Sequence, residues 1–66
     1  MALGTVKCFD HSKGIGWIRE RGGRDVYVHF SAIREDGFRT LREGEEVEFE
    51  VRETDRGLHA HNVFRH

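Results

Sequence analysis

The sequence predicts an all-β fold, namely a small closed barrel of five antiparallel strands. β-Branched and aromatic residues gather in five short runs, which glycine and polar residues separate, and no stretch has convincing helical length. Short strands without a helix to cover one face of the sheet must either close on themselves or form a sandwich. For a chain of 66 residues the closed barrel fits best.

The expected strands cover residues 3–9, 15–19, 25–30, 46–52 and 58–64. The fourth strand is the clearest, because Val47, Phe49 and Val51 alternate with charged residues at a period of two. The same alternation turns Ile18 and Val28 inward in the second and third strands. Each of these strands therefore has one buried face and one exposed face.

The expected connections differ in length. Gly22 and Gly23 suit a tight hairpin that pairs the second strand with the third, since glycine accepts positive φ angles. Residues 54–57 form a short polar turn, whereas the connection over residues 31–44 is long, and such loops are often functional. In the last strand the apolar residues change parity between Ala60 and Val63, which predicts a β-bulge.

Length and charge restrict the possible functions. A chain of this size has room for one hydrophobic core, so we expect residues 1–66 to form a single domain. The formal net charge of -1 excludes the overall basicity of a histone-like protein. Basic residues dominate up to Arg42, whereas acidic residues crowd positions 43–55. Any affinity for phosphate must therefore come from a local arrangement of cations.

The single Cys8 cannot form an internal disulfide, and the first residues do not resemble a secretory leader. We therefore expect the protein to lie in the cytoplasm, where a reducing environment keeps cysteine as a free thiol. No apolar stretch approaches the ~20 residues that a membrane-spanning helix needs, so no membrane partner is expected. Small size and charged faces favour a monomer.

The outward positions of the second and third strands carry large aromatic side chains. Trp17 and Tyr27 lie on neighbouring strands, and His29 shares their face. These rings either cap the barrel as a second small core or offer an exposed platform for stacking. Lys7, Lys13 and further arginines in the loops surround them in sequence. Cations beside aromatic faces are typical of single-stranded nucleic-acid binding, because the cations attract phosphates while each ring accepts any base.

Two segments, KGIGWI at residues 13–18 and VYVHF at residues 26–30, resemble the paired ribonucleoprotein motifs of bacterial cold-shock proteins. The resemblance extends over nearly the whole chain. It includes GTVK at residues 4–7, SAI at 31–33, GFRTL at 37–41, EG at 43–44, RG at 56–57 and NV at 62–63. It implies a five-stranded barrel of the oligonucleotide-binding (OB) type. It also implies a protein that binds single-stranded RNA and DNA, as an RNA chaperone or transcription antiterminator, and that needs no cofactor.

The resemblance also implies roles for individual residues. Bases would contact five rings, which are those of Trp17, Tyr27, His29, Phe30 and Phe38. Lys7, Lys13 and Arg56 would contact phosphate or base edges, and Asp25 would accept a hydrogen bond from a base. Phe9 is either part of the platform or part of the core, because the parity of the first strand does not decide.

This chain departs from the family pattern at two positions. Cold-shock proteins usually have tryptophan where this chain has Cys8, and phenylalanine or tyrosine where it has Ile15. Two stacking platforms are therefore expected to be missing, at roughly 1 to 3 kcal/mol for each base. If Cys8 shares the inward parity of Val6, it would instead pack inside the barrel.

Other signals are weak. His59 and His61 could face the same way, but two histidines do not make a metal site, and we interpret them as surface residues. No arrangement of nucleophile, base and orienting group suggests an enzyme. The main alternative to nucleic-acid binding is a barrel that uses the same aromatic patch against another protein.

Overall fold

The computed structural model describes residues 1–34 and 40–65. The elements in chain order are β1 (Ala2–Asp10), β2 (Ile15–Glu20), β3 (Asp25–His29), the 3-10 helix η1 (Phe30–Ala32), β4 (Glu46–Thr54) and β5 (Gly57–Arg65). The all-β class is confirmed, and each strand ends within two residues of its expected bounds. Phe30, expected at the end of the third strand, instead begins η1.

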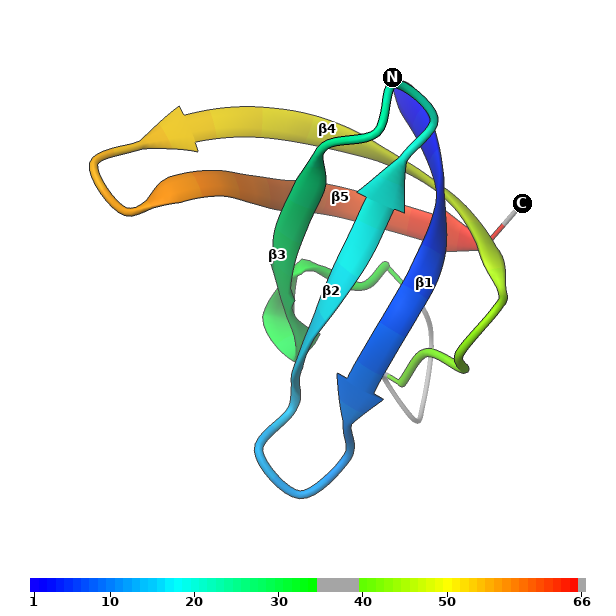
Figure 1. Cartoon of the computed structure of the whole chain (residues 1–66). Coiled ribbons are helices and arrows are strands. Elements are labelled where there is room, and N and C mark those ends of the chain that lie inside the picture. The colour runs from blue at the N-terminus through cyan, green and yellow to red at the C-terminus, as the bar shows by residue number, and fades with distance from the viewer. Residues whose placement is uncertain (35–39, 66) are drawn as a thin grey trace.

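The strands form a closed barrel in the order β1-β2-β3-β5-β4 (Figure 1). Four of the neighbouring pairs among the described strands are antiparallel, as expected. The pair β3–β5 is parallel and joins Tyr27 to His59. An odd number of strands with alternating direction cannot close without one parallel pair, which explains this difference. The closure brings β5 beside β3 although residues 30–56 lie between them in the sequence.

The barrel interior is filled by apolar side chains from every strand. Val6, Ile18, Val26, Val28, Val47, Phe49, Ala60 and Val63 are buried there. The alternation expected for β2, β3 and β4 is therefore confirmed. Burying side chains of this size is worth roughly 1.5 to 3 kcal/mol each, so this core supplies the main driving force for folding.

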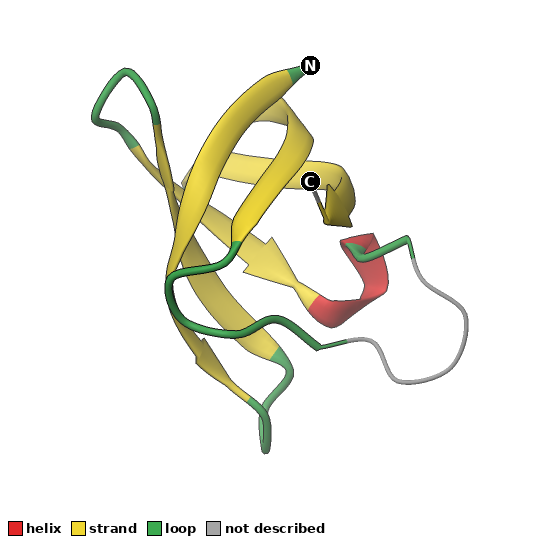
Figure 2. Cartoon of the chain, turned by 90° about the vertical axis from the view of Figure 1, so that its right-hand side faces the viewer, coloured by secondary structure: helices red, strands yellow, loops and turns green. Residues whose placement is uncertain are grey.

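The long connection after β3 contributes to the core as well. Ile33 and Leu41 are both buried, and Ile33 forms a parallel bridge with Val63. Figure 2 shows η1, in red, directly after the end of β3. The ends of this connection therefore close the barrel, while residues 35–39 lie outside the described part of the chain.

The turns agree with their expected positions. The β2–β3 hairpin places Gly23 at a φ of 100° and has hydrogen bonds from Gly23 N to Glu20 O and from Glu20 N to Arg24 O, each 2.8 Å long. Its loop therefore runs from Arg21 to Gly23 and is longer than the two-residue turn that the glycine pair suggested. The β4–β5 turn is short and polar, and Thr54 Oγ1 donates a hydrogen bond to Gly57 O.

The bulge expected in the last strand is confirmed. The pairing of β4 with β5 shifts between Glu48 and Glu50, and Asn62 has a φ of 50°. Asparagine tolerates this left-handed conformation better than most residues. Its side chain donates to Glu50 Oε1 over 2.6 Å and accepts from Arg34 Nε over 2.9 Å. The bulge allows Ala60 and Val63 to face the core together.

Candidate nucleic-acid interface

A single row of side chains crosses the outer surface of the barrel. The strand registers pair Cys8 with Trp17, Trp17 with Tyr27, Tyr27 with His59, and His59 with Arg52. Residues directly opposite one another on neighbouring strands point to the same face of a sheet. The row therefore runs from β1 through β2, β3 and β5 to β4.

The rings in this row contact one another. The centroids of Trp17 and Tyr27 lie 5.6 Å apart with an interplanar angle of 75°, and those of Tyr27 and His59 lie 5.1 Å apart at 47°. Edge-to-face and tilted contacts of this kind are favourable between aromatic rings. Trp17 is 44% exposed, so the ring is part of an outer surface and does not belong to a second small core.

Two further rings lie at the end of β3. His29 and Phe30 have centroids 4.5 Å apart, and Phe30 is 42% exposed. The backbone amide of Ser31 donates to His29 Nδ1, so this nitrogen is an acceptor and the neutral ring carries its proton on Nε2. The hydrogen bond fixes the imidazole beside Phe30 and leaves its Nε2–H directed away from Ser31.

A bulge in β1 determines which way the side chains of Cys8 and Phe9 point, a question that the sequence left open. The pairing of β1 with β2 shifts between Val6 and Cys8, so Lys7 and Cys8 are both exposed. The alternative in which Cys8 packs inside the barrel is therefore wrong, because the bulge changes the parity after Val6. Phe9 is half-buried and packs against the core, with its ring 5.4 Å from that of His11.

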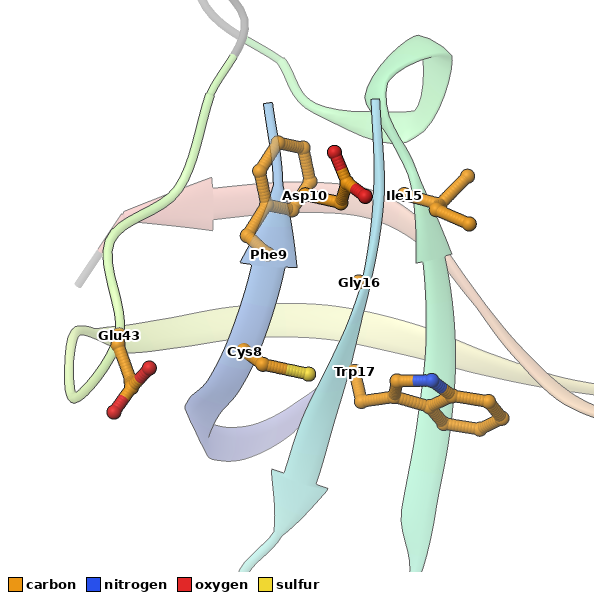
Figure 3. A pocket seen from close by; sticks show the side chains of 7 residues that line it. All are labelled: Cys8, Phe9, Asp10, Ile15, Gly16, Trp17 and Glu43. Carbon is orange, nitrogen blue, oxygen red and sulfur yellow. The ribbon is translucent and has the colours of Figure 1, made fainter. Parts of the chain in front are cut away.

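A pocket of about 390 Å³ opens on the outer side of β1 and β2, next to Trp17 (Figure 3). Its lining consists of Cys8, Phe9, Asp10, Ile15, Gly16, Trp17 and Glu43. A Cβ at Gly16 would clash with the carbonyl oxygen of Cys8 and lie 2.7 Å from Phe9 Cδ1. Only glycine therefore lets the Phe9 ring lie against β2.

The candidate cations differ in their partners. Lys7 Nζ lies 3.3 Å from Asp25 Oδ2, and Arg19 Nε lies 3.5 Å from Asp25 Oδ1. The hydrogen bond from Lys7 lowers the pKa of Asp25 against a smaller opposing effect of burial, and the charge of Arg19 adds to the lowering. The side chains of Lys13 and Arg56 form no ion pair within residues 1–34 and 40–65.

The structure brings most of the sequence-predicted residues to one surface. Trp17 and Tyr27 are in contact, and His29 and Phe30 lie where β3 ends. Lys13 lies in the loop that precedes β2. Arg56 lies in the turn before β5, at the start of the strand that carries His59. Phe38 falls outside the described residues.

His59 is the residue that sequence analysis missed. We interpreted it as an unremarkable surface histidine, but its ring packs on Tyr27. The contact depends on the parallel β3–β5 pair, and no local pattern in the sequence indicates that pair. The outward parity of His59 next to the buried Ala60 was the only available signal.

Within residues 1–34 and 40–65, no group of three or more His, Cys, Asp or Glu side chains could hold a metal ion. No helix in that part of the chain is both long and apolar enough to cross a membrane.

Comparison with known proteins agrees with the geometry. The family model described as 'Cold-shock' DNA-binding domain matches residues 2–66. Cold shock protein CspA of Staphylococcus haemolyticus (strain JCSC1435) is 55% identical over 65 residues, which cover 98% of each chain. Cold shock-like protein CspA of Stigmatella aurantiaca (strain DW4/3-1) is 58% identical over 64 residues, which cover 96% of this chain and 94% of that protein.

A solved structure supports the fold separately. The structure of drosophila Unr CSD456 aligns with a TM-score of 0.81 over 98% of this chain at 21% sequence identity. The aligned part is 26% of that longer chain, so the likeness bears on the OB-type barrel alone. The family match and the bacterial relatives go further than the fold, and they show that this chain belongs to the cold-shock domain family, a family of nucleic-acid-binding proteins and not of enzymes.

Proposed function

We propose that this protein binds single-stranded RNA and DNA by stacking bases on its outer aromatic surface. The observation that carries the proposal is the row of contacting rings formed by Trp17, Tyr27 and His59, which is outward-facing and crosses three strands. Stacking of a base on an aromatic side chain is worth roughly 1 to 3 kcal/mol and tolerates every base.

Each candidate residue has a physical role in this proposal. Trp17, Tyr27 and His59 stack successive bases, and His29 with Phe30 continues the platform at the end of β3. We also assign a stacking role to Phe38 on the basis of the family resemblance. The half-buried Phe9 offers one edge of its ring to a base and packs the rest against the core.

The cations hold the backbone of the strand. Lys13 and Arg56 are available for phosphate because neither is engaged in an ion pair with another described residue. Lys7 becomes available only when a ligand separates it from Asp25. Oδ2 of Asp25 then accepts a hydrogen bond from a base edge, while Oδ1 stays beside Arg19.

Binding without strong sequence demands suits an RNA chaperone or a transcription antiterminator. Such a protein has to melt and hold many different single strands, and stacking supplies affinity that does not depend on one sequence. We propose that it acts as a monomer in the cytoplasm.

A fluorescence titration tests the proposal. Trp17 is the single tryptophan of the chain, so its emission reports on the proposed surface alone. Adding a short oligothymidine should quench it saturably, and added salt should weaken the effect. No quenching, together with capture of a protein ligand on the same patch, would favour the protein-interaction alternative.

A matched pair of variants sharpens this test. His59 and His61 lie on the same outer face of β5, but His59 contacts Tyr27 whereas His61 lies opposite Glu50. His59→Ala should weaken oligothymidine binding by about 1 kcal/mol or more, and His61→Ala should leave it unchanged. Equal effects of the two substitutions would remove His59 from the platform.

A further inference from the structure

The pocket beside Trp17 differs in chemistry from the aromatic row. Its walls are the side chains of Phe9, Ile15 and Trp17, and the small thiol of Cys8 keeps it open. Its volume of about 390 Å³ lies within the roughly 300 to 1,000 Å³ of small-molecule pockets. The apolar walls and this volume suit a flat heterocycle that enters the pocket edge first.

The two charged groups at the pocket, the carboxylates of Asp10 and Glu43, are hydrogen-bond acceptors. Asp10 Oδ1 accepts from the backbone amides of Ser12 and Lys13 over 2.9 and 3.1 Å, which fixes this carboxylate at one end of the pocket. Glu43 lies on the opposite side, beside β1 (Figure 3). Among the described residues, neither Asp10 Oδ2 nor the Glu43 carboxylate has a hydrogen-bond donor.

Two carboxylates at a nucleic-acid surface select by charge and by hydrogen bonding. They repel phosphate, so the backbone of a strand must stay outside, next to Lys13. A carboxylate accepts hydrogen bonds and donates none, so it favours a base edge with an amino group and disfavours one with a carbonyl oxygen. Cytosine presents N4–H₂ where uracil and thymine present O4.

We propose that this pocket holds one nucleobase that carries an exocyclic amino group, in preference to uracil or thymine, with Glu43 and Asp10 as the acceptors. The inference rests on the proposed function, because it requires a single strand on the aromatic row. The row then supplies affinity for any base, and the pocket adds selectivity at one position of the strand. Glu43 and Asp10 are thus specificity-determining residues.

The experiment compares cytosine with uracil, which have nearly the same shape. The protein is titrated with the heptamer (dU)₇ and with the seven heptamers that contain a single dC, with Trp17 fluorescence as the readout. We expect one position at which dC tightens binding about fivefold or more over dU, and little change at the other positions. A preference below twofold at every position would overturn the inference.

A pair of charge-matched variants tests the assignment to the pocket. Glu43→Gln should reduce the dC preference at the selective position to below about twofold, because an amide both donates and accepts. Glu46→Gln removes the same charge outside the pocket, at the start of β4, where Glu46 pairs with Arg21 over 3.6 Å, and it should retain the preference. Retention of the preference in Glu43→Gln would contradict the inference.

The outcomes separate this inference from the proposed function. If none of the heptamers quenches Trp17, the proposed binding of single strands fails, and the pocket inference fails with it. If all heptamers bind with equal affinity, the stacking surface is supported and the selective pocket alone is wrong.

Discussion

The outer face of β4 and the outer face of β2 and β3 lie over the same core but differ in chemistry. On β4 the outward positions before Arg52 are occupied by Glu46, Glu48 and Glu50. On β2 and β3 the central outward positions are the rings of Trp17 and Tyr27. The inward residues of all three strands are apolar, so the barrel itself does not determine the ligand. The outward residues determine it.

Two of the carboxylates on β4, those of Glu46 and Glu50, have partners within the protein. Glu46 pairs with Arg21, and Glu50 pairs with Arg52 at 3.6 Å and accepts a 2.6 Å hydrogen bond from Asn62. Partners of this kind keep the acidic face compatible with folding, while its charge repels a polyanion. The net charge of -1 thus conceals an acidic face and an aromatic face with nearby cations.

Among the changes that test this difference between the two faces, removal of an aromatic ring should alter the affinity for a single strand most. We predict that Trp17→Ala and Tyr27→Ala each weaken binding to a single strand by roughly 1 to 3 kcal/mol and leave the fold intact, because both side chains lie outside the core. Anisotropy of a labelled oligothymidine gives the affinity, and thermal melting gives the stability. Glu46→Ala on the acidic face is the control and should not weaken binding. Unfolding of either ring variant would mean that the rings are structural.

Adding a ring should have an effect of similar size and opposite sign. Cys8 is exposed, stands opposite Trp17 and ends the aromatic row on β1. We predict that Cys8→Trp tightens binding to a pyrimidine-rich strand by roughly 1 to 3 kcal/mol with an unchanged melting temperature. A lower melting temperature without a gain in affinity would show that the larger ring disturbs the packing around Phe9.

The residues in these two predictions differ in how well the sequence alone predicts their positions. The strand positions followed from alternation, which is local, and the bulge in β5 followed from the conflict between Ala60 and Val63. The bulge at Lys7 left no such signal, because Cys8 and Phe9 can each be placed on either face. The contact of His59 with Tyr27 depends on how the barrel closes, and this pairing is not local. The pocket likewise depends on Glu43, which is distant in sequence from β1 and β2.

Added salt should have a smaller effect on the binding constant for a single strand. We propose that three cations, Lys7, Lys13 and Arg56, contact phosphates, and each contact with a single strand contributes about 0.7 to the slope of log K against log salt. We predict a slope of about -2, measured with oligothymidine between 50 and 200 mM salt. A slope steeper than about -5 would mean that the basic surface is much larger and that the acidic face does not confine it.

The smallest expected effect is that of low pH on the melting temperature. The hydrogen bond from Lys7 lowers the pKa of Asp25 at the start of β3, and the hydrogen bond from Asn62 lowers the pKa of Glu50 on the acidic face. A carboxyl group with a lower pKa in the folded state stabilises the fold above its unfolded pKa and loses this contribution as pH falls through the folded value. We therefore predict that the melting temperature falls below about pH 4. The fall should be smaller in Glu50→Gln, and an equal fall in both proteins would contradict the role of Glu50.

The central claim is that a single strand lies on the aromatic face and avoids the acidic face. Chemical-shift mapping of ¹⁵N-labelled protein with oligothymidine tests this claim directly. We predict that the largest shifts occur at the indole N–H of Trp17 and at the amides of Tyr27 and His59, with little change at Glu46 and Glu48. Shifts that are largest on β4, or uniform over the barrel, would contradict it.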